Sequence, residues 1–282
     1  MTKLTVVVEN TVAMPFIPGV KGGVLGEHGL AVLIEGEMGR WLYDTGRGKA
    51  LAPNLAALGV EADSIDGVIL SHGHLDHVSG LTDLLNARTK PLPVYAHPGL
   101  FVTRFSRSAG ELRPVGAKFS QKEWEALGAE FHFNEDPVKL APGMWLSGMI
   151  LKREPLEKIR EPFFIKDGEE LAPDLIWDEQ ALVIEGERGL LVLTGCAHSG
   201  IVSILGQVKQ ALPGRKIWGV MGGLHLLNAG PERLALTIGA LRAESVEFVA
   251  VGHCTGFQES AAIAAAFPEA FQAMNAGVCF NV

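Results

Sequence analysis

The chain has 282 residues, of which 48% are hydrophobic and 20% charged, a composition typical of a globular protein. Its net charge of −8 argues against a nucleic-acid-binding protein, which would present a basic face. Three cysteines are too few for a disulfide framework, and no apolar run reaches the roughly 18 residues of a membrane span. The first residues lack the apolar core of a signal peptide. We therefore expect a reduced, cytoplasmic protein without a membrane or nucleic-acid partner.

The first ninety residues predict alternating strands and helices. Short β-branched or aromatic runs between Gly, Asn and Asp indicate strands at 4–10, 29–37 and 40–46. A short helix is expected within 54–65. GVIL at 67–70 is apolar throughout and too short for a helix, which is typical of a strand buried on both faces.

Four candidate metal ligands, His72, His74, Asp76 and His77, follow this strand directly in the sequence SHGHLDH. Apolar residues at helical spacing follow them, so the four residues are expected on a loop between the carboxyl end of a strand and the start of a helix. Ligand sites of α/β proteins commonly lie on such loops. His72 and His74 can place two imidazoles on one ion, and Asp76 and His77 can serve a neighbouring ion. This donor set suits Zn²⁺, Mn²⁺ or Fe²⁺ better than Ca²⁺.

The remaining ligands must come from later in the chain, and an internal similarity indicates where. AVLIEGEMGRWLYDTG at 31–46 resembles ALVIEGERGLLVLTG at 181–195, which predicts two hairpins of the same design in two similar β-rich halves. If the halves pack face to face, the residues after the matching strands share one edge with the histidine loop. The candidates delivered to that edge by the hairpins and by two further strands are Asp44, Cys196, His198, His225 and His253.

The middle of the chain, about 99–175, is expected to be a loop-rich insertion with a helix near 121–129. It carries a basic run, Arg104, Arg107, Arg113 and Lys118. This run is either a solvated face or an electropositive wall that receives an anionic substrate group, with Arg104 and Arg107 as its candidate contacts.

The other histidines and cysteines receive simpler interpretations. His28 and His97 lie in loops that could line the site, and His132 is expected to be structural. Cys254 is expected to pack as a small buried hydrophobe, and Cys279 has no expected role.

These motifs resemble a known family. SHGHLDH is similar to the His-x-His-x-Asp-His signature of the metallo-β-lactamase superfamily, and LYDTG to its first motif. LTGCAHSGI, GVMGGLHL and VGHCTG occur in the same order in a branch resembling dihydropterin–ribofuranosylaminobenzene 5′-phosphate synthase-like metal-dependent hydrolases. The resemblance implies one α/β domain over residues 1–282: a four-layer αββα sandwich with a metal site on one edge.

The resemblance also implies two divalent metal ions, with Zn favoured and Mn or Fe as alternatives. One would be held by His72, His74 and His198. The other would be held by Asp76, His77 and His253. Asp44 would orient a ligand without touching metal. Two points stay open: His225 could replace His198 or His253, and Cys196 stands near where many relatives carry a bridging aspartate, so either its thiolate binds metal or no side chain bridges.

The expected function is metal-dependent hydrolysis or group transfer on a small molecule, with phosphorylated molecules among the candidates. A metal-activated water attacks a carbonyl or phosphoryl centre, Asp76 accepts a proton, and His225 stabilises the developing charge. The branch implies a synthase in which an arylamine displaces diphosphate from a pterin. The alternatives are a phosphodiesterase or lactonase of the same fold, or a metal-binding sensor without turnover. An RNA-processing nuclease is disfavoured by the acidic charge balance.

Overall fold

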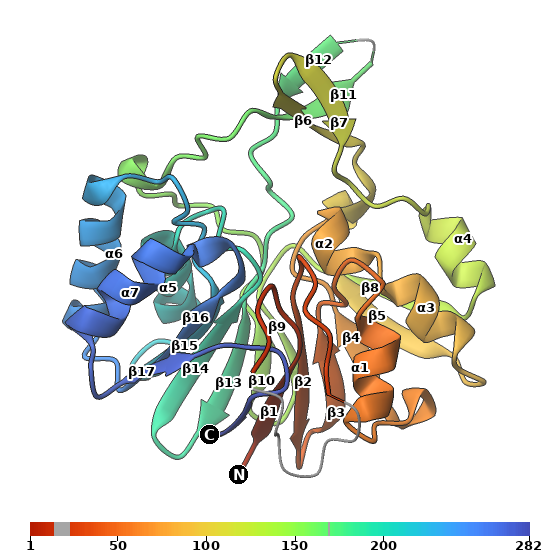
Figure 1. The fold of residues 1–282 in the computed structure, drawn as a ribbon, viewed down its shortest axis with the longest axis horizontal. Coiled ribbons are helices and arrows are strands. Elements are labelled where there is room, and N and C mark those ends of the chain that lie inside the picture. Colours follow the sequence, from red (N-terminus) through yellow and green to blue (C-terminus); the bar gives the residue numbers. More distant parts are fainter. Residues whose placement is uncertain (14–22, 169) are drawn as a thin grey trace.

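The computed structural model describes residues 1–13, 23–168 and 170–282. Two seven-stranded sheets pack face to face, and helices cover both outer faces, as Figure 1 shows. The predicted four-layer αββα sandwich is therefore confirmed. Among the described residues, no helix is long and apolar enough to cross a membrane.

The first sheet has the order β18-β1-β2-β3-β4-β5-β8. The strands β3, β4, β5 and β8 run parallel, whereas β18, β1, β2 and β3 are successively antiparallel. The bounds of its strands are β1 Lys3–Val8, β2 Ala31–Gly36, β3 Gly39–Tyr43, β4 Gly67–Ile69, β5 Leu92–Ala96, β8 Ala129–Phe133 and β18 Cys279–Asn281.

The second sheet has the order β17-β16-β15-β14-β13-β10-β9, with β14 to β17 parallel. The bounds of its strands are β9 Val138–Ala141, β10 Met144–Leu146, β13 Leu182–Gly186, β14 Gly189–Thr194, β15 Ile217–Gly223, β16 Phe248–Gly252 and β17 Phe271–Ala273. The two predicted hairpins match in pairing: Gly36 faces Gly39 in β2–β3, and Gly186 faces Gly189 in β13–β14.

Each outer face of the sandwich has its own helices (Figure 1). The helices on the side of the first sheet are α1 Leu51–Ala57, α2 Leu75–Val78, α3 Leu81–Asn86 and α4 Gln121–Ala126. Those on the side of the second sheet are α5 Ile201–Ala211, α6 Pro231–Ala243 and α7 Phe257–Ala266. Short 3₁₀ turns complete the chain at η1 Ala62–Ser64, η2 Pro98–Phe101, η3 Pro155–Glu157 and η4 His253–Thr255.

The apolar pattern explains the layers. In β4, Val68 joins the core under the helices, whereas Ile69 joins the core between the sheets. This is why GVIL is apolar on both faces. In α5, Ile201, Ile204 and Val208 lie at helical spacing and pack onto the second sheet.

Segment 99–175 contains more regular structure than the loops that we expected. Its strands β8, β9 and β10 belong to the two large sheets. A separate four-stranded sheet stands above one edge of the sandwich in Figure 1. Its strands are β6 Arg104–Ser108, β7 Glu111–Pro114, β11 Phe163–Asp167 and β12 Glu170–Pro173. The helix expected near 121–129 is present as α4. The boundaries of an insertion stay a prediction.

Candidate metal centre

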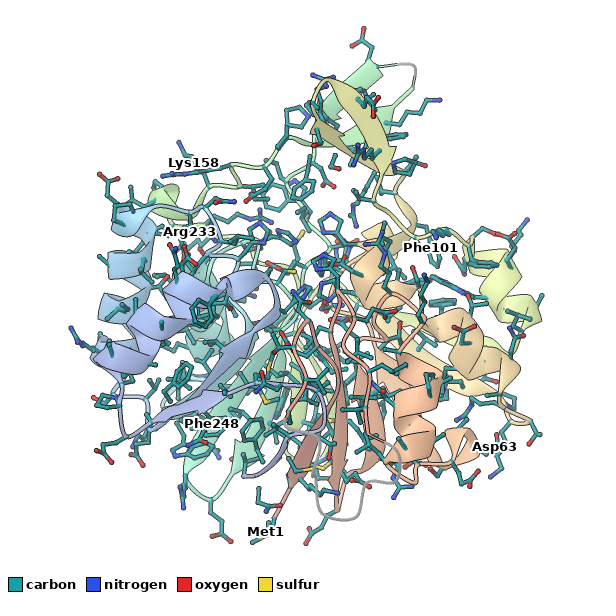
Figure 2. All side chains as sticks on the ribbon, in the orientation of Figure 1. Met1, Asp63, Phe101, Lys158, Arg233 and Phe248 are labelled. Carbon is teal, nitrogen blue, oxygen red and sulfur yellow. The ribbon has the colours of Figure 1, made fainter. Side chains whose placement is uncertain are left out.

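The histidine loop lies where parallel strands of both large sheets end. β3 and β4 of the first sheet lead to Asp44 and to the loop at 71–74. β14, β15 and β16 of the second sheet lead to Cys196, His225 and His253. Figure 2 shows nitrogen-bearing side chains gathered at this edge, beneath the four-stranded sheet.

Three imidazoles converge in a first cluster. His74 Nδ1 lies 3.0 Å from His72 Nε2 and 3.1 Å from His198 Nε2. All three side chains are buried. Burial lowers the pKa of His74 to about 3 and holds the pKa values of His72 and His198 well below their ordinary value. The three rings are therefore neutral at neutral pH, and each can direct a lone pair at the shared point.

A hydrogen-bond chain determines which nitrogen of His72 carries its proton. Ser71 Oγ donates to Asp44 Oδ2 at 2.8 Å and lies 2.9 Å from His72 Nδ1. Since the hydroxyl proton is committed to Asp44, Ser71 accepts the proton of Nδ1, and Nε2 keeps its lone pair. A cation fits this cluster, because the nitrogen separations are near the roughly 3.3 Å implied by two 2.0–2.1 Å bonds on a tetrahedral zinc.

A second cluster adjoins the first. His77 Nε2 lies 3.2 Å from His253 Nε2. Asp76 Oδ2 lies 3.6 Å from His253 Nε2 and 3.9 Å from His77 Nε2. His28, which is half exposed, places Nε2 3.1 Å from the same Asp76 oxygen. The carboxylate and the two imidazoles form a donor set that also suits a divalent cation.

Charge orients His77 within this cluster. Its Nδ1 lies 2.7 Å from Asp44 Oδ2. Burial alone would lower the pKa of His77, but Asp44 and Asp76 raise it to about 9. A cation between Asp76, His77 and His253 would take the place of that extra proton. On the other side, burial lowers the pKa of His253 to about 4, and its Nδ1 lies 3.1 Å from Asn10 Oδ1.

Strained backbone accompanies the convergence. Asp44, Ala197, His225 and His253 all have positive φ, between 48° and 59°. A non-glycine residue in this region costs about 1–3 kcal/mol, and such residues concentrate at functional sites.

The structure gives positions for Cys196 and His225, whose roles the sequence left open. Cys196 Sγ lies 3.1 Å from His77 Nε2, within reach of the second cluster. The ring of His225 packs at 4.2 Å from that of His198, and its Nε2 lies 3.1 Å from Glu161 Oε2. Its exchange for His198 or His253 as a metal ligand stays a prediction. Its position beside both clusters is compatible with the expected contact to a reacting group.

The basic run does not form a common wall. Arg104 is buried with only 3% of its side chain exposed, and it binds Asp178 through both terminal nitrogens and Asp174 through Nε. Its charge is thus compensated inside the protein, so Arg104 belongs neither to a solvated face nor to an electropositive wall, whereas Arg113 and Lys118 are exposed as a solvated face requires. Arg107 is exposed on the four-stranded sheet and covers the ring of Phe164 at 4.5 Å.

The remaining histidines divide as follows. His28 reaches Asp76 and so borders the site. His97 Nδ1 accepts a hydrogen bond from Gly99 N and caps the turn η2. His132 stacks on Tyr95 within the first sheet, at 4.8 Å between ring centroids.

Comparison with known proteins supplies the family. The model of the metallo-beta-lactamase superfamily matches residues 25–209. The chain belongs to the metallo-beta-lactamase superfamily. The resemblance inferred from the motifs is thereby confirmed.

Three proteins are similar to this chain over nearly their full lengths. A 7,8-dihydropterin-6-methyl-4-(beta-D-ribofuranosyl)-aminobenzene-5′-phosphate synthase of Methanocaldococcus jannaschii is 34% identical over 89% of this chain and 88% of its own. The crystal structure of Tm1679, described as a metal-dependent hydrolase of the beta-lactamase superfamily, has a TM-score of 0.83. It is 27% identical and covers 100% of this chain and 99% of its own. An uncharacterised protein of M. jannaschii is 28% identical over 90% of this chain and 91% of its own.

This superfamily member fixes its two ligand-bearing loops with acidic residues that the sequence analysis missed. Asp178 Oδ2 accepts a hydrogen bond from Gly73 N at 2.7 Å. Glu179 accepts hydrogen bonds from the backbone N–H groups of His198 and Ser199, both at 2.6 Å. Both acids are buried. The available signal was a pair of consecutive acids two residues before an apolar strand.

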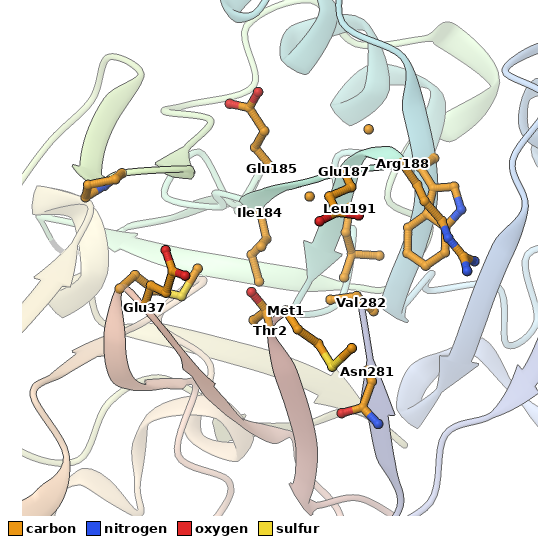
Figure 3. A pocket seen from close by; sticks show the side chains of 15 residues that line it. Met1, Thr2, Glu37, Ile184, Glu185, Glu187, Arg188, Leu191, Asn281 and Val282 are labelled. Carbon is orange, nitrogen blue, oxygen red and sulfur yellow. The ribbon is translucent and has the colours of Figure 1, made fainter.

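A cavity of about 690 Å³ lies at the opposite end of the sandwich, near the turns of the two matching hairpins (Figure 3). Its walls include Ile184, Leu191 and Trp218, with Glu37 and Arg188 among the charged residues. The described residues that line this cavity include no histidine or cysteine, so it lacks a donor set like those of the two clusters.

Proposed function

We propose that this protein is a metal-dependent hydrolase or transferase whose centre holds two divalent cations, with zinc as the expected metal. The observation that carries the proposal is the convergence of two adjoining donor sets at one sheet edge. The first set is His72, His74 and His198. The second set is Asp76, His77 and His253.

Cations bound at these sites supply an activated water and polarise a carbonyl or phosphoryl oxygen. The surrounding residues do the rest. Asp44 and Ser71 hold His77 and His72 in the orientation that binding requires. Asp76 is ionised, since His77 and His28 lower its pKa although burial would raise it. Its carboxylate is proposed to accept the proton of the attacking water, and because the low pKa makes it a weak base it would hold that proton only transiently.

His225 is placed to stabilise charge on the reacting group. Burial would lower its pKa, but nearby Cys254 and Glu161 raise it to about 10. As an imidazolium next to His198, it can donate a hydrogen bond to an oxygen that becomes negative. We therefore propose His225 as an electrophilic catalyst and Glu161 as the residue that positions it.

For the substrate, we propose a phosphorylated small molecule with a planar ring. The synthase of M. jannaschii, 34% identical, supports this proposal by its name. Phe163 of β11 also supports it, because its ring lies 4.9 Å from that of His74 and 5.8 Å from that of His198. A planar ring can stack against this phenyl group beside the centre.

Metal analysis and a substrate panel test the proposal. The purified protein should contain at least two divalent cations per chain. Chelation and His74→Ala should each abolish turnover, whereas His132→Ala, a histidine outside the centre, should preserve it. The panel should contain chromogenic phosphodiesters, a lactone, a thioester and a dihydropterin diphosphate with an arylamine acceptor. Tight metal binding without turnover of any of these would favour a metal-binding sensor, and full turnover without metal would refute the proposal.

A further inference from the structure

A third donor cluster lies beside the two histidine clusters. Cys196 Sγ, Cys254 Sγ and one imidazole nitrogen of His225 all lie within 4.8 Å of one another. The three residues come from the ends of the three neighbouring strands β14, β16 and β15. Cys196 and Cys254 are free thiols, so the cluster is not closed by a disulfide.

A glycine allows the loops that carry Cys196 and Cys254 to approach each other closely. Gly223, at the end of β15, stands between them: a Cβ at this position would lie 2.6 Å from Cys254 Sγ and 3.3 Å from Cys196 Cα. Cys254 Sγ also contacts the carbonyl of Cys196 at 3.4 Å. Any residue other than glycine at 223 would therefore displace Cys254 Sγ or the carbonyl oxygen of Gly195, which lies 2.5 Å from the same Cβ.

The third donor is held by a carboxylate. Glu161 Oε2 lies 3.1 Å from His225 Nε2, which leaves Nδ1 as the free nitrogen of the ring. In the described part of the chain, both ring nitrogens are buried without a hydrogen bond, and Nε2 has only its ion-pair contact with Glu161. A carboxylate that fixes one ring nitrogen while the other faces soft donors is the arrangement found around zinc-bound histidines.

We propose that Cys196, Cys254 and His225 bind a further cation of thiol-preferring chemistry, such as Zn²⁺. The cation would take the place of the Nδ1 proton of His225, so this site and the electrophilic role proposed above for His225 belong to two alternative states of the protein. Two sulfurs and one nitrogen form the Cys₂His donor set of an open zinc site, with solvent in the fourth position. On binding, each thiol releases one proton to solvent, and the two resulting thiolates provide the negative charge that a third dication requires beside two others. Cys196, 3.1 Å from His77 Nε2, would be shared with the second cluster.

This site makes a prediction that does not depend on turnover. The reduced, metal-free full chain is titrated with Co²⁺ under nitrogen, while bound cobalt and the near-ultraviolet sulfur-to-cobalt charge-transfer band are measured. Cys254→Ser should bind one equivalent fewer than the unmodified chain and lose at least half of the band. The control Cys279→Ser removes the exposed thiol outside the cluster and should change neither quantity.

Other outcomes are decisive in the same way. If Cys254→Ser fails to fold, as judged by its thermal unfolding, His225→Asn should show the same loss of one equivalent. Equal stoichiometry and absorption in Cys254→Ser and Cys279→Ser would overturn the proposal. A disulfide between Cys196 and Cys254 in anaerobically purified protein would also overturn it. Failure of the proposed catalytic function would leave the cobalt readout unchanged, so the two ideas fail separately.

Discussion

Asp178 shows how much one buried carboxylate can organise. It accepts a hydrogen bond from Gly73 N, in the middle of the histidine loop, and two from the guanidinium of Arg104. Burial alone would lower the pKa of Arg104, but Asp178 and Asp174 raise it. The ion pair thus ties the four-stranded sheet to the loop that carries His72 and His74.

We predict that Asp178→Asn destabilises the protein. Asparagine leaves the buried Arg104 with one carboxylate in place of two, and breaking a buried ion pair costs about 3–5 kcal/mol. Since Asp174 remains, the lower end of this range is expected for the free energy of unfolding, measured by urea denaturation. The control Glu111→Gln, at an exposed position of β7, should change it by less than about 0.5 kcal/mol. A loss below about 1 kcal/mol for Asp178→Asn would contradict this view of the pair.

Phe163 and Phe164 offer a matched test of the proposed substrate ring. Successive residues of a strand point to opposite faces, and here Phe163 faces the histidines while Phe164 lies under Arg107. An aromatic contact contributes about 0.5–1.5 kcal/mol, so Phe163→Ala should raise KM by up to about tenfold with little change in kcat. Phe164→Ala should leave KM unchanged. Equal effects of the two changes in steady-state kinetics would exclude a specific role for Phe163.

Individual residues also show the limit of sequence reasoning. Arg104 and Arg107 belong to the same basic run, yet one is buried between two aspartates and the other is exposed. Their difference depends on partners some 70 positions later, which no local pattern reveals. For the same reason, Asp178 and Glu179 were missed: their role lies in backbone groups of distant loops.

At the scale of elements, the site depends on close approach of the two sheets where β4 and β14 end. Gly195 follows β14 directly, and a Cβ on it would lie 2.1 Å from Ser71 Oγ and 3.1 Å from Asp44 Oδ2. Only glycine lets the strand that leads to Cys196 and His198 approach the hydrogen-bond chain behind His72 so closely.

We predict that Gly195→Ala separates the two halves of the centre. The added methyl group meets buried Ser71, and such overpacking costs about 1–3 kcal/mol of stability. Cation affinity, measured by competition with a chromogenic chelator, should fall by about 10–100-fold, the range seen when groups that orient metal ligands are disturbed.

Gly206→Ala is the matched control for this change. Gly206 lies within α5, and a Cβ there would meet nothing within 4 Å. Alanine should therefore stabilise the helix by about 0.5–1 kcal/mol and leave cation affinity unchanged. Similar affinities for both variants would show that the approach at Gly195 is not required.

At the scale of the whole molecule, the sandwich could be predicted because the sequence patterns that indicate its strands are local and occur in both halves. Apolar runs such as GVIL mark strands that are buried on both sides, and the two Glu-Gly-Glu hairpins mark equivalent places in the two sheets. The convergence of His72–His77 with His198 and His253 followed from the resemblance and from strand ends. The four-stranded sheet was not predicted, because its short, exposed strands lack a clear apolar alternation.

The metal-free protein should be most stable near pH 6.5–7. His74 and His253 have folded pKa values of about 3 and about 4, below the ordinary 6.5. As pH falls below 6.5, the unfolded chain binds protons that the folded chain does not, so stability decreases. His77 contributes to the pH dependence of stability with the opposite sign. Its folded pKa is about 9, so the folded chain holds a proton that the unfolded chain loses, and stability decreases as pH rises from 6.5 toward 9.

Urea denaturation of chelator-treated protein between pH 4.5 and 9 measures this profile. Each such histidine changes the free energy of unfolding by at most about 1.4 kcal/mol per pH unit. A steady rise in stability across the whole range would contradict the raised pKa of His77. Excess Zn²⁺ should raise the midpoint near neutral pH, because a ligand at a hundredfold its Kd adds about 2.7 kcal/mol.

Asp178 and Glu179 are consecutive residues, yet they hold loops that belong to different sheets. Asp178 accepts hydrogen bonds from Gly73 in the histidine loop and from Arg104 at the start of β6. Glu179 accepts a hydrogen bond from His198, in the loop that leaves the second sheet. Displacement of the segment 178–179 would therefore disturb the hydrogen bonds to the loops of both sheets together.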